Sequence, residues 1–236
     1  MPQLFHPEIP DPSSTIEVAG DDCHHLIRVR RNTVGDTVYL RTPDGGRVLT
    51  EISAIHKNTC ILKVTRIIPP VEGPYTLALA MPVLKGRRND LIVEKGVETG
   101  VTRFIPVSFD RSVPDSDSVQ KKAQRWRRIV SEAFKQSDAI FMPTIDSPCT
   151  SYELFESASG YTNRIIGDVH EQTLFSAAGI GRSVIVAVGP EGGFSDDERK
   201  RALNSQWSHV RLHTNQLRAE TASIVLPAIV RHFMAL

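Results

Sequence analysis

The stretch SVIVAVGPEGGFSDDE, residues 183–198, joins an apolar run to a glycine-rich turn and a helix start. The run is dense in β-branched residues and stops at glycine and proline, which is typical of a buried central strand. Ser195 and Glu198 match the S-x-x-E capping box, which predicts a helix from Asp196. The turn therefore lies at the carboxyl end of a parallel strand, where open α/β sheets bind ligands.

The composition of the turn leaves its role open. Gly192 and Gly193 can adopt positive φ and carry no side chain, so backbone amides could approach a ligand closely. The turn matches neither the GxGxxG dinucleotide fingerprint nor a P-loop, and Glu191 argues against phosphate. A plain tight turn fits as well as a binding loop. An acidic residue there would suit ribose hydroxyls or a cationic ligand.

Strands and helices alternate along the chain around this stretch. Strand-like apolar runs occur at 76–83, 103–108 and 164–169, and helix-like segments occur at 87–99 and 118–136. The longer helix carries an apolar stripe at three- and four-residue spacings, formed by Val119, Ala123, Trp126, Ile129, Val130, Ala133 and Phe134. This alternation predicts an α/β domain with a mostly parallel sheet and helices on both faces.

The first third of the chain has a different rhythm. Residues 15–68 contain short strand-like runs separated by the turn-forming segments TPDGG and HKN. Residues 69–74, PPVEGP, hold three prolines and one glycine and predict a linker. We therefore expect a small β-rich domain over residues 1–70 and the α/β domain over residues 74–236.

The overall charge gives no general attraction to polyanions. The chain has 236 residues, and its 28 Lys and Arg against 27 Asp and Glu leave a formal net charge of +1, so nucleic-acid binding would need local basic patches. A hydrophobic content of 40% suits a soluble globular protein. There is neither a signal peptide nor an apolar run of about 18 residues, so we expect a cytoplasmic protein without a membrane partner.

The three cysteines, Cys23, Cys60 and Cys149, are too scattered for a disulfide framework, which fits a reducing compartment. His24 and His25 follow Cys23 directly. Adjacent side chains rarely converge on one ion, and no second ligand pair follows at a zinc-site spacing. We therefore expect no bound metal.

A second stretch, LHTNQLRAETASIVLPAIV at residues 212–230, leads from a polar loop into an apolar helix. Glu220 or Thr221 could cap that helix. Arg218 precedes a segment that must be buried, and an arginine beside a core usually has an assigned partner. Pro227 would cost a backbone hydrogen bond in a helix beginning near 220, which predicts a kink or a later start.

The two stretches together resemble the GPEGG and LRTETA motifs of the RsmE-type bacterial 16S ribosomal RNA uridine-N3 methyltransferases, a family of the SPOUT superfamily. Three further segments resemble motifs of that family in the same order: His25–Arg31 with Gly35, Lys95–Val101 with Pro106 and Arg111, and Trp126 with Ala133–Ser137. The resemblance covers nearly the whole chain.

This resemblance implies a fold, a cofactor and partners. The expected fold is a small N-terminal PUA-like β-barrel that binds RNA, followed by a C-terminal SPOUT α/β domain whose end is threaded into a trefoil knot. The expected activity is S-adenosylmethionine-dependent methylation of N3 of a uridine in 16S ribosomal RNA, either as naked RNA or in the 30S subunit. Family members are homodimers with the active site near the subunit interface.

The resemblance also implies three sets of site residues. The cofactor loops would be formed by Asp168, His170, Gly189, Pro190, Glu191, Gly192, Gly193, Leu212, Gln216, Leu217 and Arg218. The basic residues expected to contact RNA phosphates are Arg28, Arg30, Arg31, Lys121, Lys122, Arg125 and Arg128, although a solvated helix face would explain the cluster between 121 and 128 equally simply. The catalytic candidates are Arg218 and Glu220.

The catalytic pair follows from what the reaction needs. Uridine N3 carries an imide proton with a pKa of about 9, so it is a poor nucleophile until that proton is removed or the anion is stabilised. Arg218 could stabilise negative charge on O2 and O4 with a permanently charged, two-pronged donor. Glu220 could orient Arg218 or accept the proton. Alternatively, both residues could simply pair with or cap the last helix.

Two departures from the family pattern keep other functions open. Where the family usually has EQSGR, this chain reads KQSDA at residues 135–139, and Ala219 replaces the threonine of LRTETA. A protein that binds RNA without turnover, or a methyltransferase that acts on another RNA, are the alternatives. Methyl transfer to 30S subunits would separate them.

Overall fold

The computed structural model describes residues 4–69, 75–112, 116–137, 139, 141–176, 178–212 and 215–234, and the side chains of 116–118, 120 and 121 fall outside that description. The chain divides into two compact units, Met1–Gly73 and Pro74–Leu236. Residues 70–74 of the expected linker lie outside the described residues.

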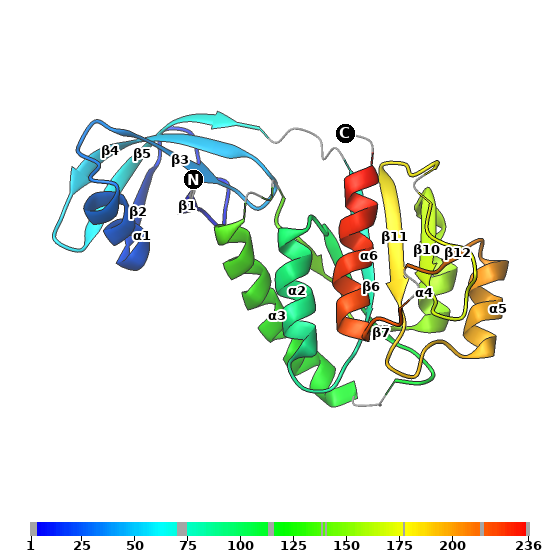
Figure 1. Cartoon of the computed structure of the whole chain (residues 1–236). Helices are drawn as coiled ribbons and strands as arrows, with labels where there is room; N and C mark the ends of the chain where they lie inside the picture. The colour runs from blue at the N-terminus through cyan, green and yellow to red at the C-terminus, as the bar shows by residue number, and fades with distance from the viewer. Residues whose placement is uncertain are drawn as a thin grey trace. The chain divides into compact units, whose positions relative to one another are not determined.

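The first unit is built on a mixed five-stranded sheet with the order β1-β3-β4-β5-β2 (Figure 1). Its elements are β1 (Leu4–Phe5), β2 (Thr15–Ala19), α1 (Gly20–His24), the π-helical turn η1 (His25–Val29), β3 (Thr37–Arg41), β4 (Arg47–Ile55) and β5 (Thr59–Ile68). Alternate residues of β4 point inward, so Val48, Thr50 and Ile52 are fully buried. Leu26 of η1 joins this core, which fixes the helical segment to the sheet.

The second unit is built on a seven-stranded sheet. Every pairing between its described strands is parallel, as predicted. The strand order is β12-β10-β11-β6-β7-β8, with β9 also paired to β7. Its strands are β6 (Thr76–Pro82), β7 (Arg103–Ser108), β8 (Thr144–Ile145), β9 (Cys149–Thr150), β10 (Asn163–Gly167), β11 (Ser183–Val188) and β12 (Ser208–Val210).

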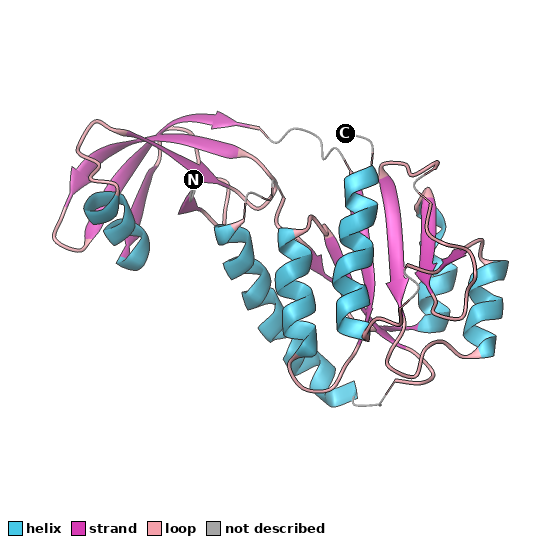
Figure 2. Cartoon of the chain, in the orientation of Figure 1, coloured by secondary structure: helices cyan, strands magenta, loops and turns pink. Residues whose placement is uncertain are grey.

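Helices cover both faces of this sheet (Figures 1 and 2). One face carries α2 (Arg88–Glu98), α3 (Ser116–Gln136) and α6 (Ala219–Phe233), and the other carries α4 (Ser151–Ser157), the 3₁₀ turn η2 (Ala158–Gly160) and α5 (Asp196–Asn204). The apolar stripe predicted for α3 is confirmed: Trp126, Val130 and Phe134 are at most 2% exposed. The helices explain why β6 and β11 are apolar on both faces.

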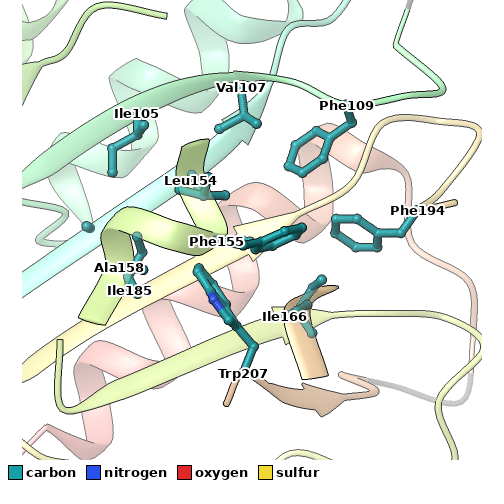
Figure 3. Close-up of a cluster of buried hydrophobic side chains, with 14 residues drawn as sticks. Ile105, Val107, Phe109, Leu154, Phe155, Ala158, Ile166, Ile185, Phe194 and Trp207 are labelled. Atoms are coloured by element: carbon teal, nitrogen blue, oxygen red, sulfur yellow. The ribbon is translucent and has the colours of Figure 1, made fainter. Parts of the chain in front are cut away.

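The core on the α4 and α5 face contains two pairs of packed aromatic side chains among aliphatic ones (Figure 3). The rings of Phe155 and Trp207 meet edge to face at 5.4 Å, and those of Phe109 and Phe194 do so at 5.2 Å. This geometry directs the positive ring edge of one aromatic at the negative face of the other. The Phe109–Phe194 pair also joins the segments that follow β7 and β11.

The last helix differs from the sequence expectation. It begins at Ala219 after Arg218, whose side chain forms no cap, so neither Glu220 nor Thr221 is the capping residue. A later start at Pro227 is also wrong, because this proline lies inside the helix and is buried. Its missing N–H leaves the carbonyl of Ser223 without the usual donor. Packing of α6 on α2, β6 and β11 outweighs that local cost.

No helix in the described part of the chain is long and apolar enough to cross a membrane.

Replacing Gly96 by alanine should destabilise the second unit. A Cβ at this position would lie 2.6 Å from two ring carbons of Phe104, which is fully buried. Overpacking costs about 1–3 kcal/mol against a helix-propensity gain of at most about 1 kcal/mol, so we expect a net loss of about 1–2 kcal/mol in urea unfolding. Gly160→Ala is the control, since its Cβ would meet nothing within 4 Å. Equal stability of the two variants would contradict this packing.

Candidate functional site

A cavity of about 550 Å³ opens at the carboxyl ends of β10 and β11, beside the first turn of α6. This volume lies within the usual range for small-molecule sites. Its walls come from three segments: residues 167–170 after β10, residues 188–194 after β11, and residues 216–222 at the start of α6. Arg88, at the start of α2, completes the lining. The glycine-rich turn of residues 189–193 thus forms part of a cavity wall.

The predicted capping box at the start of α5 is present. The amide of Glu198 donates to Ser195 Oγ at 3.1 Å, and the amide of Ser195 donates to Glu198 Oε2 at 2.8 Å. The carboxylate of Glu198 has no solvent exposure, and its other oxygen accepts from the amide of Asp110 at 2.9 Å. One buried carboxylate therefore fixes the end of the glycine-rich loop and ties it to the segment after β7.

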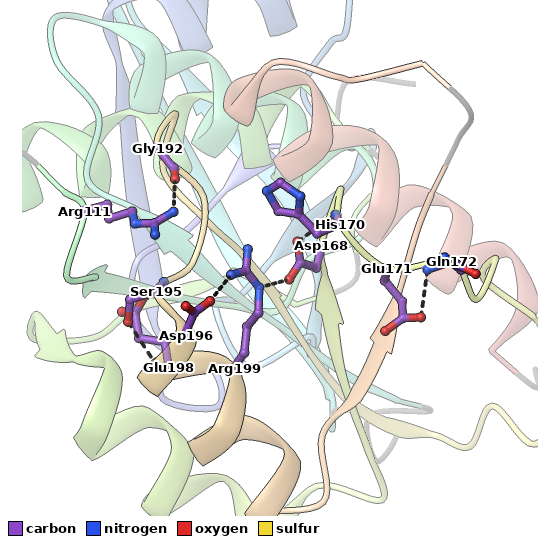
Figure 4. Close-up of polar contacts among 10 residues, drawn as sticks. All are labelled: Arg111, Asp168, His170, Glu171, Gln172, Gly192, Ser195, Asp196, Glu198 and Arg199. Atoms are coloured by element: carbon purple, nitrogen blue, oxygen red, sulfur yellow. Dashed lines mark hydrogen bonds and ion pairs between the residues drawn. The ribbon is translucent and has the colours of Figure 1, made fainter.

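Further contacts join these two loops (Figure 4). Arg111 Nη1 donates to the carbonyl oxygen of Gly192 at 3.0 Å. A Cβ at Gly192 would meet Arg111 at 3.1 Å, and a Cβ at Gly189 would meet the Phe194 ring at 3.1 Å. Gly193 has a φ of +68°, a conformation that side-chain-bearing residues rarely adopt. The glycines of this loop thus allow its backbone to approach Arg111 and Phe194 closely and to adopt the turn that forms the cavity wall.

Glu191, in the middle of the loop, contacts Arg88 Nη1 through its Oε1. Both side chains are roughly half exposed, so the pair contributes little to stability, about 0–1 kcal/mol. The contact does offset the acidic charge that the sequence places in the turn. Sequence reasoning missed Arg88 because its partner lies more than a hundred positions away and no local spacing links the two.

Asp168 forms a more protected ion pair beneath the cavity (Figure 4). Its side chain is 3% exposed, Oδ2 accepts from Arg199 Nε at 2.6 Å, and Oδ1 accepts from the amide of His170 at 3.0 Å. Burial pushes the pKa of Asp168 up, but the bonds from Arg199 and His170 outweigh it and hold the pKa below its usual value. Asp168 therefore shapes the 168–170 wall as a bound carboxylate.

The catalytic candidates lie in the same cavity. Arg218 is exposed and makes no ion pair with any residue that the structure describes. Glu220 lies in the first turn of α6, and its Oε2 is buried without a hydrogen-bond partner among the described residues. The expectation that Arg218 has an assigned partner is therefore not met within the described chain. An unpartnered carboxylate oxygen in a cavity wall suits a ligand that donates hydrogen bonds or carries positive charge.

All predicted cofactor-loop residues line this cavity except Leu212. Leu212 lies in an adjoining small cavity of about 40 Å³, together with Leu217 and Leu226. Gly167, Asp168 and Leu217 line both, so the two cavities are continuous in their walls. The three loops named from the sequence thus line one cavity, and no signal in the sequence pointed to the contribution of Arg88 from α2.

The predicted RNA contacts fall in both units. Arg28, Arg30 and Arg31 are exposed in the first unit. On α3, Arg128 is exposed, but Arg125 Nη2 is paired with Asp90 Oδ2 at 2.7 Å.

The structure describes the side chain of one of the two lysines in the α3 cluster. Lys122 is half-buried, and the side chain of Lys121 lies outside the described residues, as does Asp138 of the KQSDA segment. On α3, the ion pair with Asp90 therefore holds Arg125, whereas Arg128 of the predicted set is exposed.

Within the described residues, no group of three or more His, Cys, Asp or Glu side chains is arranged to hold a metal ion.

Comparison with known families decides what kind of chain forms this cavity. A family model for an RNA methyltransferase domain matches residues 71–231, and a model for an RNA methyltransferase PUA domain matches residues 18–65. The chain belongs to this RNA methyltransferase family. The predicted resemblance is confirmed, and so is the fold class of a small PUA-like domain followed by an α/β methyltransferase domain.

Individual relatives agree with the family match. The ribosomal RNA small subunit methyltransferase E 2 of Borreliella burgdorferi is 30% identical over 213 residues, which cover 85% of this chain and 84% of the relative. The ribosomal RNA small subunit methyltransferase E of Bacillus subtilis is 26% identical over 223 residues, covering 89% and 87%.

A solved structure shares the fold. The ribosomal RNA small subunit methyltransferase E of Neisseria gonorrhoeae, bound to S-adenosyl methionine, superposes with a TM-score of 0.80 at 24% identity, covering 99% of this chain and 98% of that one.

Asp168→Asn should lower the free energy of unfolding by about 2 kcal/mol at neutral pH, because it removes a charge-assisted bond from a buried site. Asp196→Asn is the matched control: Asp196 bonds the same guanidinium at 3.0 Å but is 87% exposed, so its loss should cost far less. Because the native pKa of Asp168 is lowered, its contribution is present above about pH 4 and is lost as the pH falls through the native value. Urea unfolding of both variants against pH measures this, and a penalty that persists in acid would contradict it.

Proposed function

We propose that this protein is an S-adenosylmethionine-dependent methyltransferase that methylates N3 of a uridine in 16S ribosomal RNA of the small subunit, in the cytoplasm. The observation that carries the proposal is the cavity at the ends of β10 and β11, because residues of both the GPEGG and the LRAETA segments line it. Membership of the RNA methyltransferase family supplies the reaction class. The names of the relatives point to ribosomal RNA of the small subunit.

The donor set of the cavity fits the proposed cofactor. When bound, S-adenosylmethionine supplies a methyl group carried on a cationic sulfonium. The carboxylate of Glu220 lies in the cavity wall, where it can face the positive charge of the cofactor. The apolar side chain of Leu217 offers a surface for an adenine ring. The methyltransferase structure solved with S-adenosyl methionine is 24% identical to this chain and shares its fold. The proposal of this cofactor therefore depends on the chemistry of the cavity.

Arg218 and Glu220 are the residues we assign to the chemistry. Arg218 is exposed in the cavity and uncommitted within the described chain, so its guanidinium is available to a substrate. There it would stabilise the charge that spreads over O2 and O4 as the N3 proton leaves. Glu220, with one oxygen unpartnered, would accept that proton or orient Arg218. Holding the uridine in line with the methyl group would supply much of the acceleration.

RNA binding would come from the exposed cations of both units. Arg28, Arg30 and Arg31 extend from and beyond η1, and Lys122 and Arg128 extend from α3. Such residues contact phosphates without reading sequence, so binding should weaken steeply with salt. Arg125 of α3 should contribute less to phosphate binding than these residues, because it already forms an ion pair with Asp90.

We also propose that the C-terminal segment is knotted and that the protein is a homodimer. After β12 at the sheet edge, Arg211 bonds the backbone of Thr173 and Phe175, and the chain then crosses to α6 beside β6 and β11. That course is compatible with threading through the loop that follows β10. On α6, Ile224, Val225 and Ile229 are only half-buried, which leaves an apolar surface for a second copy.

Arg218→Ala should abolish methyl transfer and leave cofactor binding nearly intact. Loss of one preorganised donor to a developing anion costs about a hundredfold or more in rate. The control is Arg182→Ala, which removes an exposed arginine at the amino end of β11, away from the cavity. Transfer of labelled methyl groups and calorimetric titration with S-adenosylmethionine measure the two effects. Unchanged turnover in Arg218→Ala would remove this residue from the mechanism.

Mass spectrometry of the modified nucleoside tests the reaction itself. Incubation of the protein with labelled S-adenosylmethionine and 30S subunits should yield N3-methyluridine in 16S ribosomal RNA. Methylation of another atom or another RNA would replace the proposed substrate. Cofactor binding without transfer to any RNA would favour a non-catalytic RNA-binding protein.

A further inference from the structure

A second cavity, of about 690 Å³, lies within the first unit and is separate from the site described above. One wall is formed by the end of β2, α1 and η1, and the other by residues 55–59, which connect β4 to β5. Its size is that of a small-ligand site. All residues that line it belong to the unit matched by the PUA domain model.

The charged side chains in the lining of this cavity are basic. Arg28 of η1 and Lys57 of the β4–β5 turn line it, and both side chains are exposed at its rim. Among the described residues, no aspartate or glutamate lines it, although Asp21 and Asp22 lie in the first turn of α1. A cavity with cations and no carboxylate in its wall favours an anionic ligand.

The inner surface is apolar. Ile27 and Ile55 are half-buried side chains packed against the hydrophobic core of the unit, and Cys23 is 5% exposed beneath them. Asn58 and His56 are exposed beside this surface, and both can donate and accept hydrogen bonds. An anion with a flat apolar body and polar edges fits this arrangement better than a free phosphate does.

Each wall contains a backbone hydrogen bond that fixes its local conformation. In η1 the amide of Arg30 donates to the carbonyl of His25 at 3.0 Å, the wide spacing of a π-helix, and such turns are rare and frequent at functional sites. On the other wall, the amide of His56 donates to the carbonyl of Thr59 at 2.8 Å. That tight turn places Lys57 at its tip.

We propose that this cavity binds one unpaired nucleotide of the RNA substrate, with its phosphate between Arg28 and Lys57 and its base against Ile27 and Ile55. A base within a duplex is stacked and paired, so only a single-stranded or extruded nucleotide can enter. The inference rests on the proposed function for the identity of the RNA. It adds a preference for unpaired RNA that phosphate contacts alone do not provide.

Fluorescence anisotropy with end-labelled RNA tests this, comparing a single strand with a fully paired duplex of the same sequence. Ala19→Phe places a ring in the cavity without removing a cation. It should weaken binding of the single strand by about fivefold or more, which is the effect expected from the loss of one base contact. Binding of the duplex and the salt dependence should be unchanged. Lys57→Ala should weaken binding and reduce the slope of log affinity against log salt by about 0.7–0.9.

Lys63→Ala is the matched control, because Lys63 is exposed on β5 of the same unit but does not line the cavity. Thermal unfolding of each variant shows whether Ala19→Phe is folded. Lys57→Ala changes an exposed turn residue and therefore tests the same cavity with little risk to folding. The inference is overturned if both cavity variants bind the single strand as Lys63→Ala does, or if the wild type binds duplex equally well.

Failure of the proposed function gives a different result. If the wild type neither binds S-adenosylmethionine nor transfers methyl groups, yet the cavity variants still lose single-strand affinity, the nucleotide site stands and the enzymatic proposal falls. If transfer to 30S subunits is normal and the cavity variants match Lys63→Ala, only the nucleotide site is rejected.

Discussion

The buried carboxylate of Glu198 is the constraint on which the candidate site depends. It accepts from the amides of Ser195 and Asp110, so it starts α5, ends the glycine-rich loop and joins that loop to the segment after β7. A carboxylate with no solvent exposure is stable only when its oxygens are satisfied, and here two backbone amides do this. The Phe109–Phe194 contact and the Arg111–Gly192 bond reinforce the same junction. These contacts therefore fix the conformation of the loop before any ligand binds in the cavity.

The distribution of charge in the cavity follows from the contacts around it. Asp168 is held by Arg199, and Glu191 faces Arg88, so two of the three acidic groups lie against arginines. Within the described chain, Arg218 and the Oε2 atom of Glu220 remain uncommitted. Groups that a fold leaves unpaired in a cavity are the ones available to a ligand. This is the physical basis for assigning the chemistry to these two residues.

Sequence reasoning succeeded where the interaction is local and failed where it is not. The Ser195–Glu198 capping box and the apolar stripe of α3 have fixed spacings, so they were predictable. The Arg88–Glu191 contact depends on how distant strands align, and no spacing encodes it. The start of α6 was misjudged because packing against three elements outweighs the local cost of Pro227. The π-helical turn η1 left no pattern that could be recognised.

Hydrogen–deuterium exchange with and without S-adenosylmethionine is the most direct test of the central claim, that the preshaped loops of the second unit hold this cofactor. We expect slower exchange on cofactor addition in peptides covering 167–170, 188–194 and 216–222, with no change in 19–28 and 55–59 of the other cavity. Protection confined to other segments, or none at saturating cofactor, would contradict it.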